Sequence, residues 1–242
     1  MSVLLCGVPR GPLSLRHPCR PYLSLPGVKT RSRAHSSASV TVPPPSPSPS
    51  PPLRLETGRL ARLAEGSCVA SSGGTAVLAT VCRQASQQQQ GQRQTFLPLT
   101  VDFRQKAAAA GRIPTNHLRR ELGPSDREVL TSRLVDRAVR PMAAKGVTDE
   151  VGVTVNLLSM CSTGEGDPGV LGVNSSALAL CLSSLSWGAV GCVRVCLPTS
   201  SSKPVINPTR KLRQHSTVDL VVVGTEDGRK ESHLQMLDKD ES

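Results

Sequence analysis

Between Val101 and Pro141 the chain reads VDFRQKAAAAGRIPTNHLRRELGPSDREVLTSRLVDRAVRP, and this stretch decides how the rest is interpreted. Its first residues are typical of a strand, glycine and proline then mark a loop, and the last third predicts a helix. From Arg104 to Arg140 there are nine Lys or Arg residues against four Asp or Glu. This surplus of positive charge indicates a surface that can bind phosphate groups.

The helix in this stretch has a well-marked start. Ser125 is followed three residues later by Glu128, and this spacing predicts a capping box. At helical spacing, Leu130, Leu134 and Ala138 share one stripe, because residues three and four positions apart lie on the same face. We expect that stripe to face a core.

A second stripe, formed by Arg133, Arg137 and Arg140, lies beside the first, and a twin arginine (119–120) stands on the preceding loop. One interpretation is a cationic ledge that binds phosphates, since loops make side chains available to ligands. The alternative is an ordinary solvated helix whose Asp136 forms ion pairs with Arg133 and Arg140. The charge pattern alone does not separate the two.

The chain has 242 residues and a formal net charge of +11, which is unevenly distributed. Residues 1–52 contain six Lys or Arg residues and no acid, whereas the remainder has 23 basic and 18 acidic residues. An acid-free segment rich in Arg and Ser predicts that residues 1–40 are a mitochondrial transit peptide. We therefore expect a mitochondrial location, in the matrix or the intermembrane space. Residues 41–52, with PPPSPSPSPP, predict a disordered linker.

Composition also excludes some kinds of site. The chain has only four aromatic residues (Tyr22, Phe96, Phe103 and Trp187), so bases stacking on a platform of exposed rings is not expected, and any nucleic-acid contact must be mainly to backbone phosphates. The eight cysteines include no CxxC pair with a histidine nearby, which favours free structural thiols and no metal site. No run of 18 apolar residues predicts a membrane span.

The pattern over the rest of the chain predicts an α+β domain, a mixed sheet packed with helices. Strands are expected in residues 53–83, 95–103, 151–161, 189–197 and 218–224, helices in 125–141 and 168–185, and loops at 200–202 and 207–216. Asp167 and Pro168 predict the start of the second helix. We place the domain at residues 53–224, followed by a polar tail over 225–242.

Several motifs, in one order, resemble the first RNase PH-type domain of the polyribonucleotide nucleotidyltransferases, in their mitochondrial form. The motifs are LETGRLARLAEGS, GGTAVLATV, PLTVDFRQKAAAAGRIP, GRIPTNHLRRELGPSDREVLTSRLVDRAVRP, DPGVLGVNSSALALCLS, NPTRK and STVDLVVVGT. The resemblance covers nearly all of residues 53–224. The tail lacks the closing helix usual in such domains, so the chain is interpreted as a truncated form.

The resemblance implies a phosphorolytic 3′-to-5′ exoribonuclease that works as a ring-shaped homotrimer on single-stranded RNA. Inorganic phosphate and magnesium serve the complete enzyme, and the catalytic groups belong to a second RNase PH-type domain. No catalytic or metal-binding residue is therefore expected in this chain. The implied role of the first domain is RNA binding and ring assembly, and by position the RNA-binding residues are Arg112, His117, Arg119, Arg120, Arg133 and Arg137.

Three hypotheses follow from these observations. The first is an RNA-binding and ring-assembly domain of the phosphorolytic enzyme, acting in mitochondrial RNA degradation and processing. The second is a self-sufficient RNase PH-like enzyme, whose carboxylate pair would have to be Asp102 and Asp136. The third is a non-functional truncation that perturbs assembly of full-length subunits.

Overall fold

The computed structural model describes residues 37–44, 50–84, 97–121, 123–144, 147, 149–185, 187–199, 203–225 and 235–236. Nearly all of the predicted transit peptide therefore lies outside the described residues, and so does most of the tail in which a closing helix was expected to be missing. No described helix is long and apolar enough to cross a membrane.

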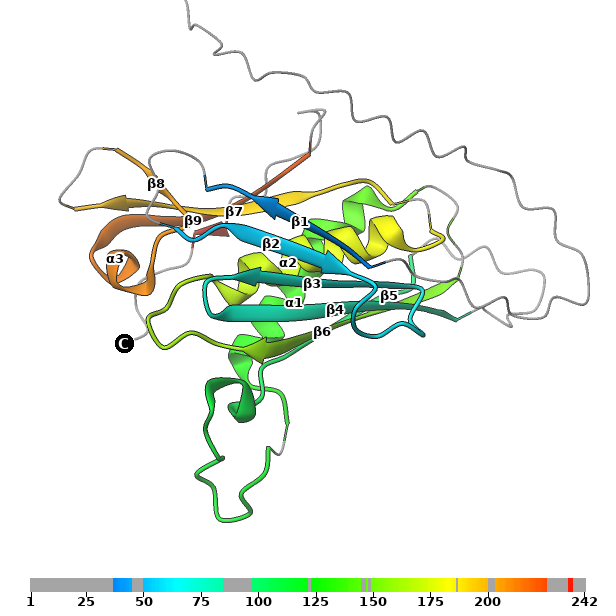
Figure 1. The fold of residues 1–242 in the computed structure, drawn as a ribbon, viewed down its shortest axis with the longest axis horizontal. Helices are drawn as coiled ribbons and strands as arrows, with labels where there is room; N and C mark the ends of the chain where they lie inside the picture. Colours follow the sequence, from blue (N-terminus) through cyan, green and yellow to red (C-terminus); the bar gives the residue numbers. More distant parts are fainter. Residues whose placement is uncertain are drawn as a thin grey trace, which may run out of the picture. The chain divides into compact units, whose positions relative to one another are not determined.

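The described elements fall into two sheets and the helices packed on them (Figure 1). The first sheet contains β1 (Ala38–Val42), β2 (Leu53–Thr57), β3 (Gly66–Ser72), β4 (Thr75–Gln84), β5 (Leu99–Arg104) and β6 (Glu150–Ser159). The second contains β7 (Gly191–Pro198), β8 (Val205–Ile206), β9 (Ser216–Gly224) and β10 (Gln235–Met236). The helices are η1 (Ala107–Ala110), α1 (Asp126–Val139), η2 (Arg140–Met142), α2 (Pro168–Leu182) and α3 (Arg210–Gln214).

The first sheet has the order β1-β2-β3-β4-β6-β5 and is mixed. Neighbouring strands are antiparallel except β5 and β6, which are parallel. Parallel neighbours need a crossover connection, and α1 supplies it between β5 and β6. The predicted α+β class with a mixed sheet is confirmed.

Helix α2 packs on both sheets, against β3 and β4 of the first and β7 of the second. Its start follows the prediction, because the Asp167 side chain accepts a hydrogen bond from the Gly169 N–H and Pro168 occupies the first turn. Farther along α2, the Asn174 side chain donates a hydrogen bond to the Cys192 carbonyl of β7 (2.9 Å) and accepts one from the Cys192 N–H (2.8 Å). These two hydrogen bonds fix α2 to the second sheet.

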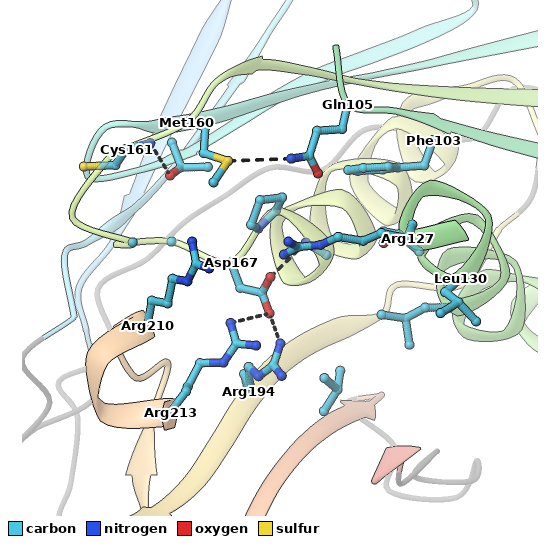
Figure 2. A pocket seen from close by; sticks show the side chains of 18 of the residues that line it. Phe103, Gln105, Arg127, Leu130, Met160, Cys161, Asp167, Arg194, Arg210 and Arg213 are labelled. Carbon is cyan, nitrogen blue, oxygen red and sulfur yellow. Dashed lines mark hydrogen bonds and ion pairs between the residues drawn. The ribbon is translucent and has the colours of Figure 1, made fainter. Parts of the chain in front are cut away.

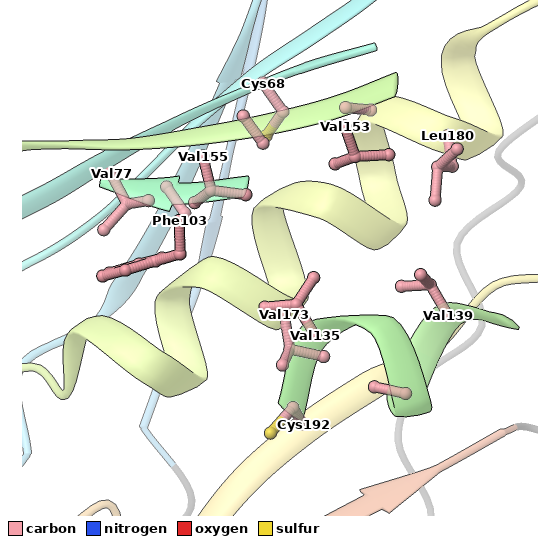
Figure 3. Close-up of a cluster of buried hydrophobic side chains, with 14 of the residues drawn as sticks. Cys68, Val77, Phe103, Val135, Val139, Val153, Val155, Val173, Leu180 and Cys192 are labelled. Carbon is pink, nitrogen blue, oxygen red and sulfur yellow. The ribbon is translucent and has the colours of Figure 1, made fainter. Parts of the chain in front are cut away.

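The core lies between the first sheet and the helices (Figure 3). Burial alternates along β4 and β6, so that every second side chain points towards α1 and α2. Phe103 on β5 is 1% exposed and is the largest fully buried side chain. Helix α2 is buried on most of its circumference, as expected for an apolar helix between two layers.

The predicted stripe of α1 reaches the core at two of its three residues, Ala138, which is buried, and Leu134, which packs half-buried against the core. Leu130 is 57% exposed, whereas Val135, Ala138 and Val139 are buried. Of the predicted stripe only Leu130 lies outside the core, and Val135 and Val139, which the predicted stripe did not include, are buried as well. The capping box of Ser125 and Glu128 is present as predicted.

Two further segments differ from the sequence-based expectation. Residues 38–42 form β1, which pairs antiparallel with β2 across the predicted boundary between leader and linker. Unpaired backbone groups at the edge of β2 give this segment a partner that composition does not reveal. Residues 207–216, predicted as a loop, contain the short helix α3, and β8 precedes it.

We predict that Gly66→Ala destabilises the domain by roughly 1–3 kcal/mol, because a Cβ on Gly66 would lie 2.1 Å from the carbonyl oxygen of Ala179 in the last turn of α2. Urea unfolding measures the change. Gly123→Ala is the matched control, since nothing lies within 4 Å of its Cβ position. Equal midpoints for both variants would contradict the close approach of β3 to α2.

Candidate nucleic-acid interface

A loop between β5 and α1 projects away from the first sheet, at the bottom of Figure 1. Its base is closed by Glu128, whose carboxylate accepts hydrogen bonds from the backbone N–H groups of Gln105 (2.5 Å) and Ser125 (2.6 Å). Glu121 accepts a second closing bond from the Ala107 N–H. Burial acts to raise the pKa of Glu128, but the bonds from Ser125 and Gln105 outweigh it and lower that pKa. The base of the loop is thus anchored by the Glu128 carboxylate in its charged form.

The far part of the loop is a turn organised by Asn116. Its side chain donates to the Arg120 carbonyl (2.6 Å) and accepts from the Arg120 N–H (3.1 Å), and its own carbonyl accepts from the Arg119 N–H. Arg119 has φ of 49°, in the left-handed region, which is uncommon for a residue other than glycine. The Asn116 bonds hold this conformation and leave both arginine side chains exposed.

The structure places the six predicted RNA-binding residues in two groups, and all six are exposed. Arg112, His117, Arg119 and Arg120 lie on the projecting loop, and Arg133 and Arg137 lie one turn apart on α1. Within the described part of the chain, none of these side chains forms an ion pair with a carboxylate. No hydrogen bond or ion pair joins the two groups within the described residues, so they are separate features and not one assembled cluster.

Arg140, the third arginine of the predicted stripe, has a structural role. Its guanidinium forms a two-point pair with Asp136 (2.7 and 3.1 Å) and also donates to the carbonyls of Leu97 and Leu99. The predicted pair of Asp136 with Arg140 is therefore present. Arg133, its other predicted partner, forms no such pair within the described residues.

A second arginine cluster, which the sequence did not predict, surrounds Asp167 at the start of α2 (Figure 2). Arg194 of β7 is 4% exposed and pairs with Asp167 and, through two hydrogen bonds of 2.6 Å, with Asp219 of β9. Arg213 of α3 joins both carboxylates at 3.9 and 3.3 Å. Two arginines and two aspartates thus form a neutral network across α2, α3 and the second sheet.

The two arginines and the two aspartates of the network stay charged because each charge is paired with an opposite one. Burial acts to raise the pKa of Asp219, but the hydrogen bonds and charge of Arg194, with Arg213, outweigh it and lower that pKa. The sequence carried one indication of this network. Alternate residues of β7 point inward, and Arg194 occupies one of these inward positions, between Cys192 and Cys196. An arginine at an inward strand position requires a buried partner.

The two carboxylates that a self-sufficient enzyme would need have other partners. Asp102 pairs with Arg104 at 2.6 Å, and Asp136 pairs with Arg140. A cavity of about 310 Å³ opens beside Asp167, between α1, the start of α2, β7 and α3, and neither Asp102 nor Asp136 lines it. No group of three or more potential metal ligands occurs among the described residues. Asp102 and Asp136 are thus each engaged in an ion pair, while the exposed arginines of the loop and of α1 pair with no carboxylate among the described residues.

Comparison with known proteins agrees with the fold and the loop motifs. Residues 51–186 match the model of RNase PH, the 3′ exoribonuclease family, domain 1. The chain belongs to this family. A polyribonucleotide nucleotidyltransferase of Akkermansia muciniphila is 44% identical over 177 residues, and that of Caulobacter vibrioides is 42% identical over 191 residues.

These matches cover 73% and 78% of this chain but 24% and 26% of the two relatives. The chain therefore spans about a quarter of the length of the curated relatives it matches.

The fold of this RNase PH domain is shared with two solved structures of low sequence identity. Rice (Oryza sativa) Rrp46 has a TM-score of 0.53 at 12% identity, covering 88% of this chain and 85% of its own. The Archaeoglobus fulgidus exosome with RNA bound to the active site has a TM-score of 0.55 at 15% sequence identity, and the match covers 86% of this chain and 79% of the exosome chain.

We predict that Asp219→Asn costs about 3 kcal/mol of stability at neutral pH, because it leaves buried Arg194 short of a charge partner. The Asp219 pKa is lowered by folding, so its contribution is present above the unfolded value of about 3.9 and is lost as pH falls through the folded value. Urea unfolding at pH 7 and below pH 4 should show the difference between wild type and variant shrinking in acid. Asp102→Asn, at an exposed pair, should cost less than about 1 kcal/mol. Equal losses for the two variants would contradict the buried network.

Proposed function

We propose that this domain binds single-stranded RNA and contributes to ring assembly in a phosphorolytic 3′-to-5′ exoribonuclease of the polyribonucleotide nucleotidyltransferase type. The observation that carries the proposal is the pair Arg119 and Arg120, exposed on a projecting loop whose backbone is fixed by Asn116. Guanidinium groups without a carboxylate partner are available for phosphate oxygens. The family relationship supports RNA as the source of those phosphates.

The second proposed element is that the domain acts through partners. Residues 1–242 contain one matched RNase PH region, and the relatives they match are about four times longer. We infer that phosphorolysis with magnesium and inorganic phosphate requires the rest of such an enzyme, in a homotrimer or together with full-length subunits. The engagement of Asp102 and Asp136 in ion pairs disfavours the self-sufficient enzyme. A mitochondrial location remains a prediction from the acid-free leader alone.

Replacing Arg119 and Arg120 with alanine tests the RNA-binding part. Each phosphate contact on a single strand releases roughly 0.7 of a counterion, so the slope of log affinity against log salt should flatten by about 1.4. Fluorescence titration of labelled RNA at several salt concentrations measures the slope. The loss should be similar for RNAs of different sequence, because phosphates carry no sequence information.

Lys211→Ala, an exposed cation on α3, is the control for a general loss of positive charge and should leave the slope nearly unchanged. The free energy of unfolding of the double variant should stay within about 0.5 kcal/mol of the wild-type value. An unchanged salt slope together with lower stability would show that the loop is only structural.

A further inference from the structure

The face of the second sheet that is turned away from α2, here called the outer face, is made of aliphatic side chains. Burial alternates along β7 and β9, and the inward positions hold Arg194 and Asp219, which bond to α2 and α3. The positions between them therefore point to the opposite side of the sheet. Ile206 of β8 lies opposite Val195 in the ladder and so shares this side. The outer face consists of Val193, Val195, Leu197, Ile206, Val218, Leu220 and Val222.

This composition departs from that of a sheet face left open to water. A sheet with one solvated face alternates apolar residues inward with polar residues outward. The first sheet follows that rule, since Thr80 of β4 and Thr154 and Asn156 of β6 alternate with buried valines. On the second sheet none of the seven outward positions has a polar side chain, although Val193 is 37% exposed and the other six are half-buried. A contiguous aliphatic surface of this kind marks an interaction site.

The segments that adjoin this sheet in the sequence are poorly suited to cover the outer face. Residues 226–234, between β9 and β10, and residues 237–242, after β10, contain nine Asp, Glu, Lys or Arg residues among fifteen. Charged side chains are almost never fully buried without a partner, and the outer face offers them no polar side chain. An apolar surface from another molecule fits the outer face better.

We propose that the outer face binds the outer face of a second copy of this chain, so that two sheets pack face to face about a two-fold axis. Sheets pack in this way at about 10 Å, with the side chains of the two faces interdigitated. Two identical uncharged faces bring no like charges together, and the contact is closed because each copy uses its whole face once. The edge strands β8 and β10 have only two residues each, which disfavours growth through the edges of the sheet.

The size of the outer face sets the expected strength of the dimer. Strand β7 has eight residues, about 26 Å, and four strands about 4.8 Å apart are about 19 Å wide, so the face covers roughly 400–500 Å² per copy. Two such faces bury about 800–1,000 Å², which is below the roughly 1,200 Å² of stable complexes. We therefore expect a weak dimer that is largely dissociated at about 1 µM and well populated at about 200 µM.

Sedimentation equilibrium of the purified chain between about 1 and 200 µM tests the proposal. The average mass should rise from 25.6 kDa towards twice that value and level off there. Leu220→Glu, at the centre of the outer face, should weaken the association about tenfold or more, because it places a charge in the apolar contact. Val222→Thr keeps the shape and the strand preference of valine and should weaken the association by a smaller factor.

Leu158→Glu is the matched control, since Leu158 is a 42% exposed leucine of β6, outside the second sheet. It should leave the association unchanged. Urea unfolding at about 1 µM, where the wild type is largely monomeric, separates a loss of association from a loss of folding. Should Leu220→Glu fail to fold, Val222→Thr carries the test, because its smaller effect on association can be measured in a folded chain.

The mass distribution discriminates between this dimer and the other ways of covering the outer face. A chain that stays monomeric at about 200 µM, or whose mass rises without a limit, would overturn the closed dimer. Equal association of the wild type and Leu220→Glu, or a trimer that Leu220→Glu leaves intact, would assign self-association to a different surface and also overturn it. The Arg119 and Arg120 double variant should dimerise like the wild type, so a failure of this proposal is distinct from a failure of the RNA-binding proposal.

Discussion

The ion network centred on Arg194 sets the arrangement of the second half of the domain. A guanidinium that is 4% exposed must be paired, because an isolated buried charge costs several kcal/mol. Its partners are the N-cap of α2 and a carboxylate of β9, so one side chain ties the helix start to both central strands of the second sheet. The bonds of Asn174 to Cys192 repeat the same connection one and a half to two turns farther along α2. With α2 held in this way, the first sheet and the loop between β5 and α1 acquire a fixed support.

Arginine has three different roles in this domain, and the partners of each side chain distinguish them. Arg194 is buried between two carboxylates, and Arg140 joins α1 to the backbone before and within β5. Arg119 and Arg120 have backbones held by Asn116 and exposed guanidiniums that pair with no carboxylate in the described part of the chain, and the proposed RNA binding is assigned to them. Arg127 and Arg210 combine exposure with a shared cavity. Total positive charge therefore says less about function than the location of the carboxylates does.

The strands and the two long helices were predictable because each has a local pattern, such as the capping box at Ser125 and the Asp167-Pro168 start. The projecting loop was also predictable, from its motif and its punctuation by glycine and proline. The exposure of Leu130 on α1 was not predictable, since its spacing from Leu134 and Ala138 is that of a core residue and only the structure shows that it lines a cavity. Strand β1 depends on pairing with β2, and the cavity joins residues 127, 167, 194 and 210, which are far apart in sequence. Such contacts are decided by tertiary packing and leave only faint local traces.

The proposed function makes these 242 residues a domain that binds RNA and releases no nucleoside diphosphate by itself. The most direct measurement is phosphate-dependent release of nucleoside diphosphates from poly(A) by the purified chain, with magnesium and excess phosphate, while RNA binding is followed in the same preparation. The account predicts saturable RNA binding and no detectable diphosphate release. Robust release that is abolished by Asp102→Asn or Asp136→Asn would contradict it and would establish a self-sufficient enzyme.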